Sequence, residues 1–583
     1  MDRSLRPLLI PTLLALLLGA AAAAQDEPGG RTPASLFVDR VDVNVVNVEV
    51  FVTDRGGRRV AGLTADDFEI FEDGRPVEIS NFYAVSRPEV EDRFAADRAL
   101  VTAQPAPARP ELPDDQQLSL LVYVDNFNLR PASRNRVLSQ IDGFLEDRID
   151  RGDRVMLVAF NGRVDVVAPF TEDRRLLLDG VQKIRKMAGY RQIREVERRE
   201  VMRTMRDVVD SVSDQGAGFT IVQETIQSYI QSAQQDLGYS LKSLRDTTRS
   251  LAGLPGRKAL LYVSDGLPQN PGQELYQHMI SLYPRGSYLA GRHVDIPLEI
   301  TDYYQPEFFQ ELVADANAHQ VTIYTLDAGG SAAGGFLFSA ETGTLGGAGG
   351  GTTDVDTLRE ANLKARMIDV AERTGGMAIR GTLNFDGALA RVGADFDSFY
   401  SLGYRSPRGG DDKYHRIEVR VKRPGLIVRH RAGYVDKPEE QRVADRTLSS
   451  LLLEVEANPL EIGIDFGPSV KTGKDEFVLP IIIRIPVRDL ALLPQGEMEQ
   501  GQLRIFLAVR DEEGRVSDLH EIPLPVSFPR EKLENARRAE IGYRTNLKIG
   551  KGTPKVAVGV WDELSGTESY VHKRVLVDDK NKV

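Results

Sequence analysis

The sequence has no cysteine, only 7 histidines and a single tryptophan in 583 residues. Without cysteine, disulfides, thiol nucleophiles and zinc–thiolate sites are excluded, so every domain must be held by its own core. The histidines form no His-x-x-x-His pair and no HExxH helix, and a Gly-x-Ser-x-Gly elbow is absent. Nothing in the sequence indicates a catalytic centre, and we expect a protein that is not an enzyme.

Basic charge and long apolar runs are also scarce. The formal net charge is -12, so no basic field exists to attract nucleic acid. The one long apolar run is N-terminal, where Arg3 and Arg6 precede Leu8 to Leu18 and a series of alanines ending at Ala24. This pattern predicts a signal peptide over residues 1–24 and an exported chain, periplasmic or secreted, with no transmembrane span after its removal. The alternative is a transmembrane anchor, for which the run is short and interrupted by Pro11 and Thr12.

Changes in periodicity divide the rest of the chain. Apolar residues alternate with polar ones over 36–86, which predicts a small N-terminal β domain. The remaining segments are a proline-rich linker at 87–116, an α/β domain at 117–407, a β-hairpin extension at 408–436, a charged linker at 437–448 and a β-sandwich of immunoglobulin or fibronectin type at 449–577, with Leu451–Glu456 as its first strand.

Within 117–407, strands alternate with helices, which predicts a doubly wound sheet. Leu120 to Val124 is an apolar run typical of a central strand buried on both faces, and Asp125 follows it directly. The other predicted strands are 154–160, 164–167 (antiparallel, at an edge), 258–263, 321–327 and 399–404. The predicted helices are 137–145, 176–184, 308–319 and 361–373.

Two insertions interrupt this domain. Residues 191–252 contain two long helical patterns, which predict an antiparallel hairpin bending at Gly216 to Gly218. The hairpin either covers the domain or projects to dock a partner. Residues 328–351 are glycine-rich but lack the Lys-Ser/Thr pair of a phosphate loop, so we expect a loop without a nucleotide.

Several ordered motifs carry a family resemblance. Asp125 ends the first strand, Asp153-Arg154-Val155 opens the second, and Gly256-Arg257-Lys258 leads to Ser264-Asp265-Gly266. In this order they resemble a von Willebrand factor A-type domain. The stretch 36–434 further resembles exported bacterial proteins described as VWFA-related, through Asp67 to Gly74 before the domain and Gly433-Tyr434 after it.

The resemblance implies a metal-ion-dependent adhesion site, with Asp-x-Ser-x-Ser after the first strand, a threonine and a later aspartate. Asp125 and Asp265 match the acidic positions, but Phe127 and Leu129 stand at the serine positions and offer no oxygen. Asn126 and Asn128 are substitute ligands, which leaves a weak, water-rich Mg²⁺ or Ca²⁺ site open. Aspartates in such turns also commonly accept backbone hydrogen bonds, so a purely structural role for them stays open too.

These observations favour an exported, non-catalytic protein that binds other proteins or serves as a scaffold. Its expected binding face carries Asp125, Asp265, Asp327, Thr220 and the glycine-rich loop, unless the helical hairpin is the recognition element. Two alternatives remain, a hydrolase or processing factor of the cell envelope and a purely structural envelope component.

Overall fold

The computed structural model describes residues 45–86, 117–212, 215–254, 256–282, 306–330, 352–407, 411–512 and 514–578. The predicted signal peptide, the 87–116 linker and residues 331–351 of the glycine-rich loop lie outside the described residues. The described residues divide into two compact units between Pro438 and Glu439. In the part of the chain that is described, no helix has the length and apolarity to cross a membrane.

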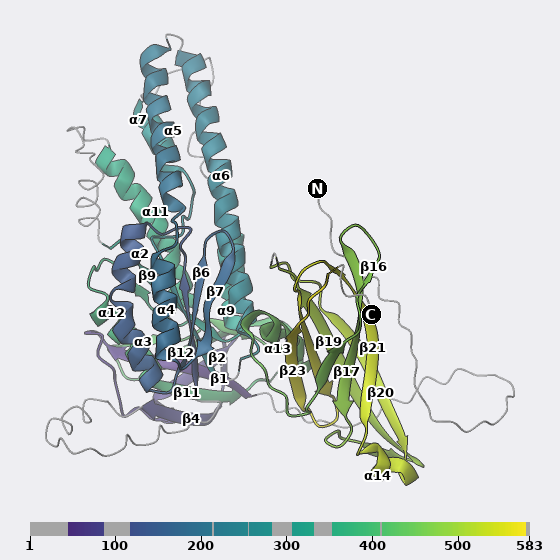
Figure 1. The fold of residues 1–583 in the computed structure, drawn as a ribbon. Coiled ribbons are helices and arrows are strands. Elements are labelled where there is room, and N and C mark those ends of the chain that lie inside the picture. Colours follow the sequence, from purple (N-terminus) through teal and green to yellow (C-terminus); the bar gives the residue numbers. More distant parts are fainter. Residues whose placement is uncertain are drawn as a thin grey trace, which may run out of the picture. The chain divides into compact units, whose positions relative to one another are not determined.

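A six-stranded sheet forms the centre of the first unit (Figure 1). Its order is β10-β9-β8-β5-β6-β7, and all neighbours are parallel except β7, which is antiparallel to β6 at one edge. All seven residues of β5 are buried, because β5 lies between β6 and β8 in the middle of the sheet. The strands are β5 (Leu118–Val124), β6 (Arg154–Phe160), β7 (Val164–Thr171), β8 (Arg257–Ser264), β9 (Val321–Asp327) and β10 (Ala378–Ile379).

Helices cover both faces of this sheet. Alternate residues of β5 (Leu120, Val122, Val124) share a core with α2 (Pro131–Leu138), α3 (Ile141–Asp150), α4 (Arg174–Arg185) and α12 (Asp386–Asp397). Against the other face lie α9 (Pro306–Ala318), α11 (Thr352–Arg373) and the C-terminal part of α6 (Gln215–Ser250), which contacts Tyr123 through Ser243. The predicted helix 137–145 is two helices in the structure, interrupted at Ser139 and Gln140.

The helical insertion is a long hairpin of α5 (Arg191–Ser211) and α6, which run side by side beyond the sheet (Figure 1). Its apolar stripes pack on α7 (Gln273–Leu282), in a core separate from that of the sheet. The predicted bend at Gly216 to Gly218 is wrong. Those glycines lie in the first turns of α6, and α5 already ends at Ser211.

The predicted N-terminal β domain and the 408–436 extension form one β module instead of two separate pieces. β1 pairs with β11 and β13, and β2 pairs with β12. The two sheets, β13-β1-β11-β4 and β14-β12-β2-β3, enclose a single core. The strands are β1 (Val45–Asp54), β2 (Phe68–Glu72), β3 (Arg75–Val77), β4 (Ile79–Ser86), β11 (Ser398–Arg405), β12 (Tyr414–Val421), β13 (Leu426–Arg429) and β14 (Gly433–Val435).

This pairing also corrects the prediction for 399–404. That segment belongs to β11 of the β module, and the short strand β10 takes the sixth place in the central sheet. The alternation of apolar residues identifies a strand but does not name its partner, since pairing between distant segments leaves no local signal.

The second unit contains two antiparallel sheets around one core. One sheet has β15 (Gly463–Phe466), β16 (Val470–Lys471), β17 (Glu476–Pro486) and β21 (Glu540–Gly550); the other has β18 (Leu493–Gln495), β19 (Met498–Arg510), β20 (His520–Pro529), β22 (Lys555–Asp562) and β23 (Glu568–Arg574), and the short helix α14 (Leu533–Ala536) precedes β21. Their assignment to an immunoglobulin or fibronectin type stays a prediction.

The predicted 437–448 linker and the predicted strand 451–456 are both corrected by α13 (Glu439–Leu453). Its apolar stripe of Val443 and Leu451 packs on Phe506, Ala508 and Trp561 of the neighbouring sheet. A charged segment followed by a short apolar run is compatible with either a strand or the end of an amphipathic helix, and tertiary packing selects the helix.

Candidate functional site

Three aspartates lie at the carboxyl ends of neighbouring parallel strands. Asp125 follows β5, Asp265 follows β8 and Asp327 ends β9. The chain order of the strands reverses between β5 and β8, and open α/β sheets bind ligands at such a reversal. The structure therefore gathers Asp125, Asp265 and Asp327 at the expected edge of the sheet.

Asp125 is fully buried, with 1% of its surface exposed, and its carboxylate accepts hydrogen bonds from the chain's own groups. Tyr262 donates its hydroxyl, Asn128 donates its side-chain amide at 2.8 Å and Ser264 donates its hydroxyl at 3.3 Å. Burial raises the pKa of Asp125, although these hydrogen bonds act in the opposite direction. The carboxylate thus anchors the loop after β5 to β8.

Asp265 and Asp327 each pair with a cation of the chain. One oxygen of Asp265 accepts from both the backbone N–H and the Nε of Arg130, at 3.0 and 2.7 Å. The charge of Asp265 raises the pKa of Arg130. Lys364 lies 3.0 Å from a carboxylate oxygen of Asp327, whose pKa is raised by burial. Guanidinium and ammonium groups therefore stand beside two of the three aspartates.

The two asparagines point in different directions. Asn128 turns toward Asp125, whereas the Asn126 amide donates to the carbonyl of Ala188 at 2.6 Å and its oxygen accepts from Arg134. Phe127 stacks on Tyr190, with ring centroids 4.3 Å apart, and Leu129 is fully buried. The serine positions of the adhesion motif are thus filled by side chains that pack inside the protein.

The set Asp125, Asn126, Asn128 and Asp265 does not fit a magnesium site in this arrangement. Magnesium requires near-octahedral oxygen ligands, and here Asn126 faces away while Arg130 holds Asp265. Within the described ranges, the one group of three acidic or histidine side chains close enough to share an ion lies elsewhere in the first unit.

Thr220 is not part of this edge, which corrects its predicted place in the binding set. It lies near the start of α6, and its hydroxyl donates to the carbonyl of Gly216 at 3.1 Å. Ser240, which contacts Asn128, is 20 residues further along the same helix, or about 30 Å at the usual helical rise. The hairpin insertion carries Thr220 away from the aspartates.

A small cavity of about 80 Å³ lies between the loop after β5 and the base of the hairpin. Its lining includes Phe127 and Asn128, with Arg191, Glu195 and Arg359 from the surrounding helices. The volume suffices for a few water molecules or a small polar group. Sequence patterns did not single out Arg191 and Arg359, because nothing local distinguishes them from the many arginines of exposed helix faces.

The charges around this cavity are strongly coupled. Burial favours the neutral acid at Glu195, but Arg359, Arg191 and Arg198 hold its pKa well below the usual range. Burial and the charge of Arg359 lower the pKa of Arg191. The Nε of Arg191 has no hydrogen-bond partner among the described residues. This arrangement offers a buried N–H donor to an acidic or carbonyl group.

By its fold the chain is a multidomain protein that combines an α/β domain with β domains. No protein-family model and no curated protein sequence match it. Solved structures with partial similarity include an aerotolerance-related membrane protein from Bacteroides fragilis (10% identity, TM-score 0.23, 48% of this chain and 98% of that chain). Another is proximal thread matrix protein 1 from the mussel byssus (11% identity, TM-score 0.20, 47% of this chain and 47% of that chain). A third consists of three N-terminal domains of the type V pili tip protein Mfa5 from Porphyromonas gingivalis (10% identity, TM-score 0.25, 86% of this chain and 78% of that chain). Scores this low carry no inference about function.

Proposed function

We propose that this chain is an exported, non-catalytic binding or scaffold protein whose α/β domain is of von Willebrand A type and holds its partner without a metal ion. The sheet order, with one antiparallel edge strand and acidic residues after β5 and β8, supports the domain type. The ion pair between Arg130 and Asp265 carries the proposal that the site is metal-independent, since a guanidinium already neutralises that carboxylate.

The partner is expected to present an acidic or carbonyl group to the cavity beside Phe127. In a metal-dependent adhesion site the ion would receive the partner's carboxylate. Here Arg191 lines the cavity; its Nη2 lies 3.6 Å from Glu195, but its Nε–H has no hydrogen-bond partner among the described residues and is the donor for such a group.

Calorimetry with Mg²⁺ and Ca²⁺ tests the metal-independence. Metal-free protein should give no binding heat with either ion at millimolar concentration, and the Asp265→Asn variant should behave likewise. Heat that is present in the wild type and lost in Asp265→Asn would overturn the proposal.

Capture of partners from envelope extracts tests the recognition site. Arg191→Gln should reduce capture at least tenfold relative to wild type, as is typical when a buried charge at an interface is removed. Arg203→Gln, on the same helix but 69% exposed in its side chain, is the matched control and should bind normally. Equal capture by both variants would rule out the cavity, and turnover of a peptide or glycoside substrate would instead favour the hydrolase alternative.

A further inference from the structure

Glu72 is a buried carboxylate without a cationic partner in the described part of the chain. It ends β2, is 3% exposed, and accepts hydrogen bonds from the hydroxyls of Tyr434 (3.1 Å) and Ser406 (3.2 Å), with the hydroxyl of Tyr404 also close to it. Burying an ionised carboxylate is costly unless it pairs with a cation or binds a metal. Neutral hydroxyls do not supply that compensation.

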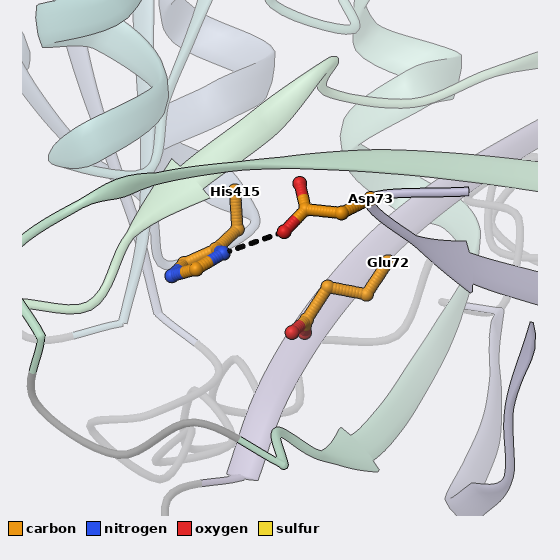
Figure 2. Close-up of side chains that lie close together, drawn as sticks. All are labelled: Glu72, Asp73 and His415. Atoms are coloured by element: carbon orange, nitrogen blue, oxygen red, sulfur yellow. Dashed lines mark hydrogen bonds and ion pairs between the residues drawn. The ribbon is translucent and has the colours of Figure 1, made fainter. Parts of the chain in front are cut away.

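Asp73 and His415 complete a compact group with Glu72 (Figure 2). One ligand atom from each of the three side chains lies within 4.8 Å of the others. The Nδ1 of His415 is 2.9 Å from a carboxylate oxygen of Asp73. Two ligands at about 2.1 Å from a tetrahedral ion are roughly 3.4 Å apart, so a small rotation of Asp73 from its 2.9 Å contact would let both groups bind one ion.

The other nitrogen of His415 is oriented by a second carboxylate. Its Nε2 lies 2.9 Å from an oxygen of Asp411. In metal sites the ligating histidine usually donates its remaining N–H to a carboxylate, which fixes the ring and selects the tautomer whose free nitrogen faces the ion. With the proton on Nε2, the lone pair of Nδ1 faces Asp73 and Glu72.

The hydroxyl of Tyr404 provides an independent indication of a missing ligand. Tyr404 is fully buried, and its hydroxyl faces Glu72 and Tyr434 without forming a hydrogen bond of full geometry to either. Burial and these two neighbours raise the pKa of Tyr404. A water molecule bound to an ion at Glu72 would donate a well-formed hydrogen bond to this hydroxyl.

We propose that Glu72, Asp73 and His415 bind a divalent transition-metal ion, with Zn²⁺ as the first choice, and that Asp411 positions His415. The imidazole nitrogen argues against Ca²⁺ and Mg²⁺, which take oxygen ligands. The ion would join the turn after β2 to β12, two segments 342 residues apart in sequence. In a chain without cysteine it takes the place of a covalent cross-link within the β module.

Calorimetry and thermal unfolding of tag-free, chelator-treated full-length protein test the site. Zn²⁺ should bind with one ion per chain and raise the unfolding midpoint of the first unit. Affinity should rise from about pH 6 to about pH 8, because the ion displaces the proton of His415. Asp411→Asn should weaken binding by about 10- to 100-fold, as expected for a residue that orients a ligand.

Asp73→Asn is the decisive variant. Asp73 has a φ of +50°, a conformation that asparagine tolerates well, and the asparagine oxygen can still accept from the backbone of Arg416. The variant should fold normally and lose Zn²⁺ binding, while His520→Gln in the second unit should bind as wild type does. The proposal is overturned if the wild type does not bind Zn²⁺ at micromolar concentration, or if Asp73→Asn binds it equally well. An adventitious ion only would bind all variants with the same affinity.

Discussion

Arg130 gives Asp265 a cation from within the chain, and this contact can be tested by mutation. Arg130→Gln leaves a carboxylate that is 1% exposed without its partner, so we expect the first unit to lose about 2 kcal/mol of stability. Adding Asp265→Asn to the same chain should recover most of that loss, because the uncompensated charge disappears. Denaturant titration followed by circular dichroism would measure both variants, and Arg58→Gln, at an exposed pair with Asp54, should change little.

A second residue-scale prediction concerns acid stability in the second unit. Burial opposes ionisation of Glu454, but hydrogen bonds from Lys555 and Arg574 lower its pKa to about 2. A depressed acid pKa contributes stability that is present above the unfolded value and lost as the pH falls through the folded one. We therefore expect the stability contributed by Glu454 to disappear between its ordinary pKa and about 2.

Trp561 is the only tryptophan of the chain and lies in the second unit, so its fluorescence reports on that unit. Glu454→Gln should lower the unfolding midpoint near neutral pH and make it less sensitive to acid than that of the wild type. If the unfolding midpoints of the wild type and Glu454→Gln fell in parallel as the pH is lowered, Glu454 would not be the source of the acid sensitivity.

The sequence predicts where Asp125 lies in the fold but does not predict which side chains contact it. A local apolar run followed by Asp125 predicts a strand end, and the same holds for Asp265 and Asp327. The groups that decide their chemistry come from elsewhere, since Arg130 is 135 residues from Asp265 and Tyr262 is 137 from Asp125. Contacts over such separations have no periodicity that one sequence could reveal.

At the scale of elements, the packing of α13 depends on a close approach to Gly559. A Cβ at Gly559 would lie 2.0 Å from the hydroxyl oxygen of Thr447 on α13. Gly559→Ala should therefore displace the helix from β22 and cost about 1–3 kcal/mol, the usual range for overpacking. Trp561 fluorescence during thermal unfolding would show it, and Gly542→Ala, which meets only an ordinary contact with Ile482, is the matched control.

The helical hairpin could be predicted from the sequence because its apolar residues recur at helical spacing over many turns. The position of the bend between its two helices could not be predicted. The apolar face of α6 continues through Gly218, so helical packing overrides the local preference of glycine for turns. α6 packs on α7 through this apolar face and contacts Tyr123 through Ser243 further along the helix. Deleting 191–252 would expose these surfaces, and single charge variants at Arg191 are the cleaner test of recognition.

For the whole molecule, the notable feature is where the α/β domain leaves and rejoins the β module. Ser86, the last residue of β4, is the register partner of Ser398, the first of β11. Residues 87–397 therefore begin and end at one point of one sheet. Joining Ser86 to Ser398 through a short hairpin turn of about four residues should give a β module that folds without the α/β domain.

The shortened protein should keep an antiparallel β spectrum and a cooperative transition, with a lower midpoint than the intact unit. The unfolding midpoint falls because three ion pairs with the α/β domain are removed. Arg429 and Arg59 lose their partner Asp395, and Glu49 loses its partner Arg257. An unfolded product would show instead that these contacts are indispensable.

The pairing of Ser86 with Ser398 also sets how the first unit responds to force. A load that pulls Ser86 and Ser398 apart acts at the same end of both strands, so it separates β4 from β11 one residue pair at a time. Their hydrogen bonds then carry the load one after another, in contrast to shear, where all would share it. Under such a load β4, which is an edge strand paired with β11 alone, would leave the sheet at low tension.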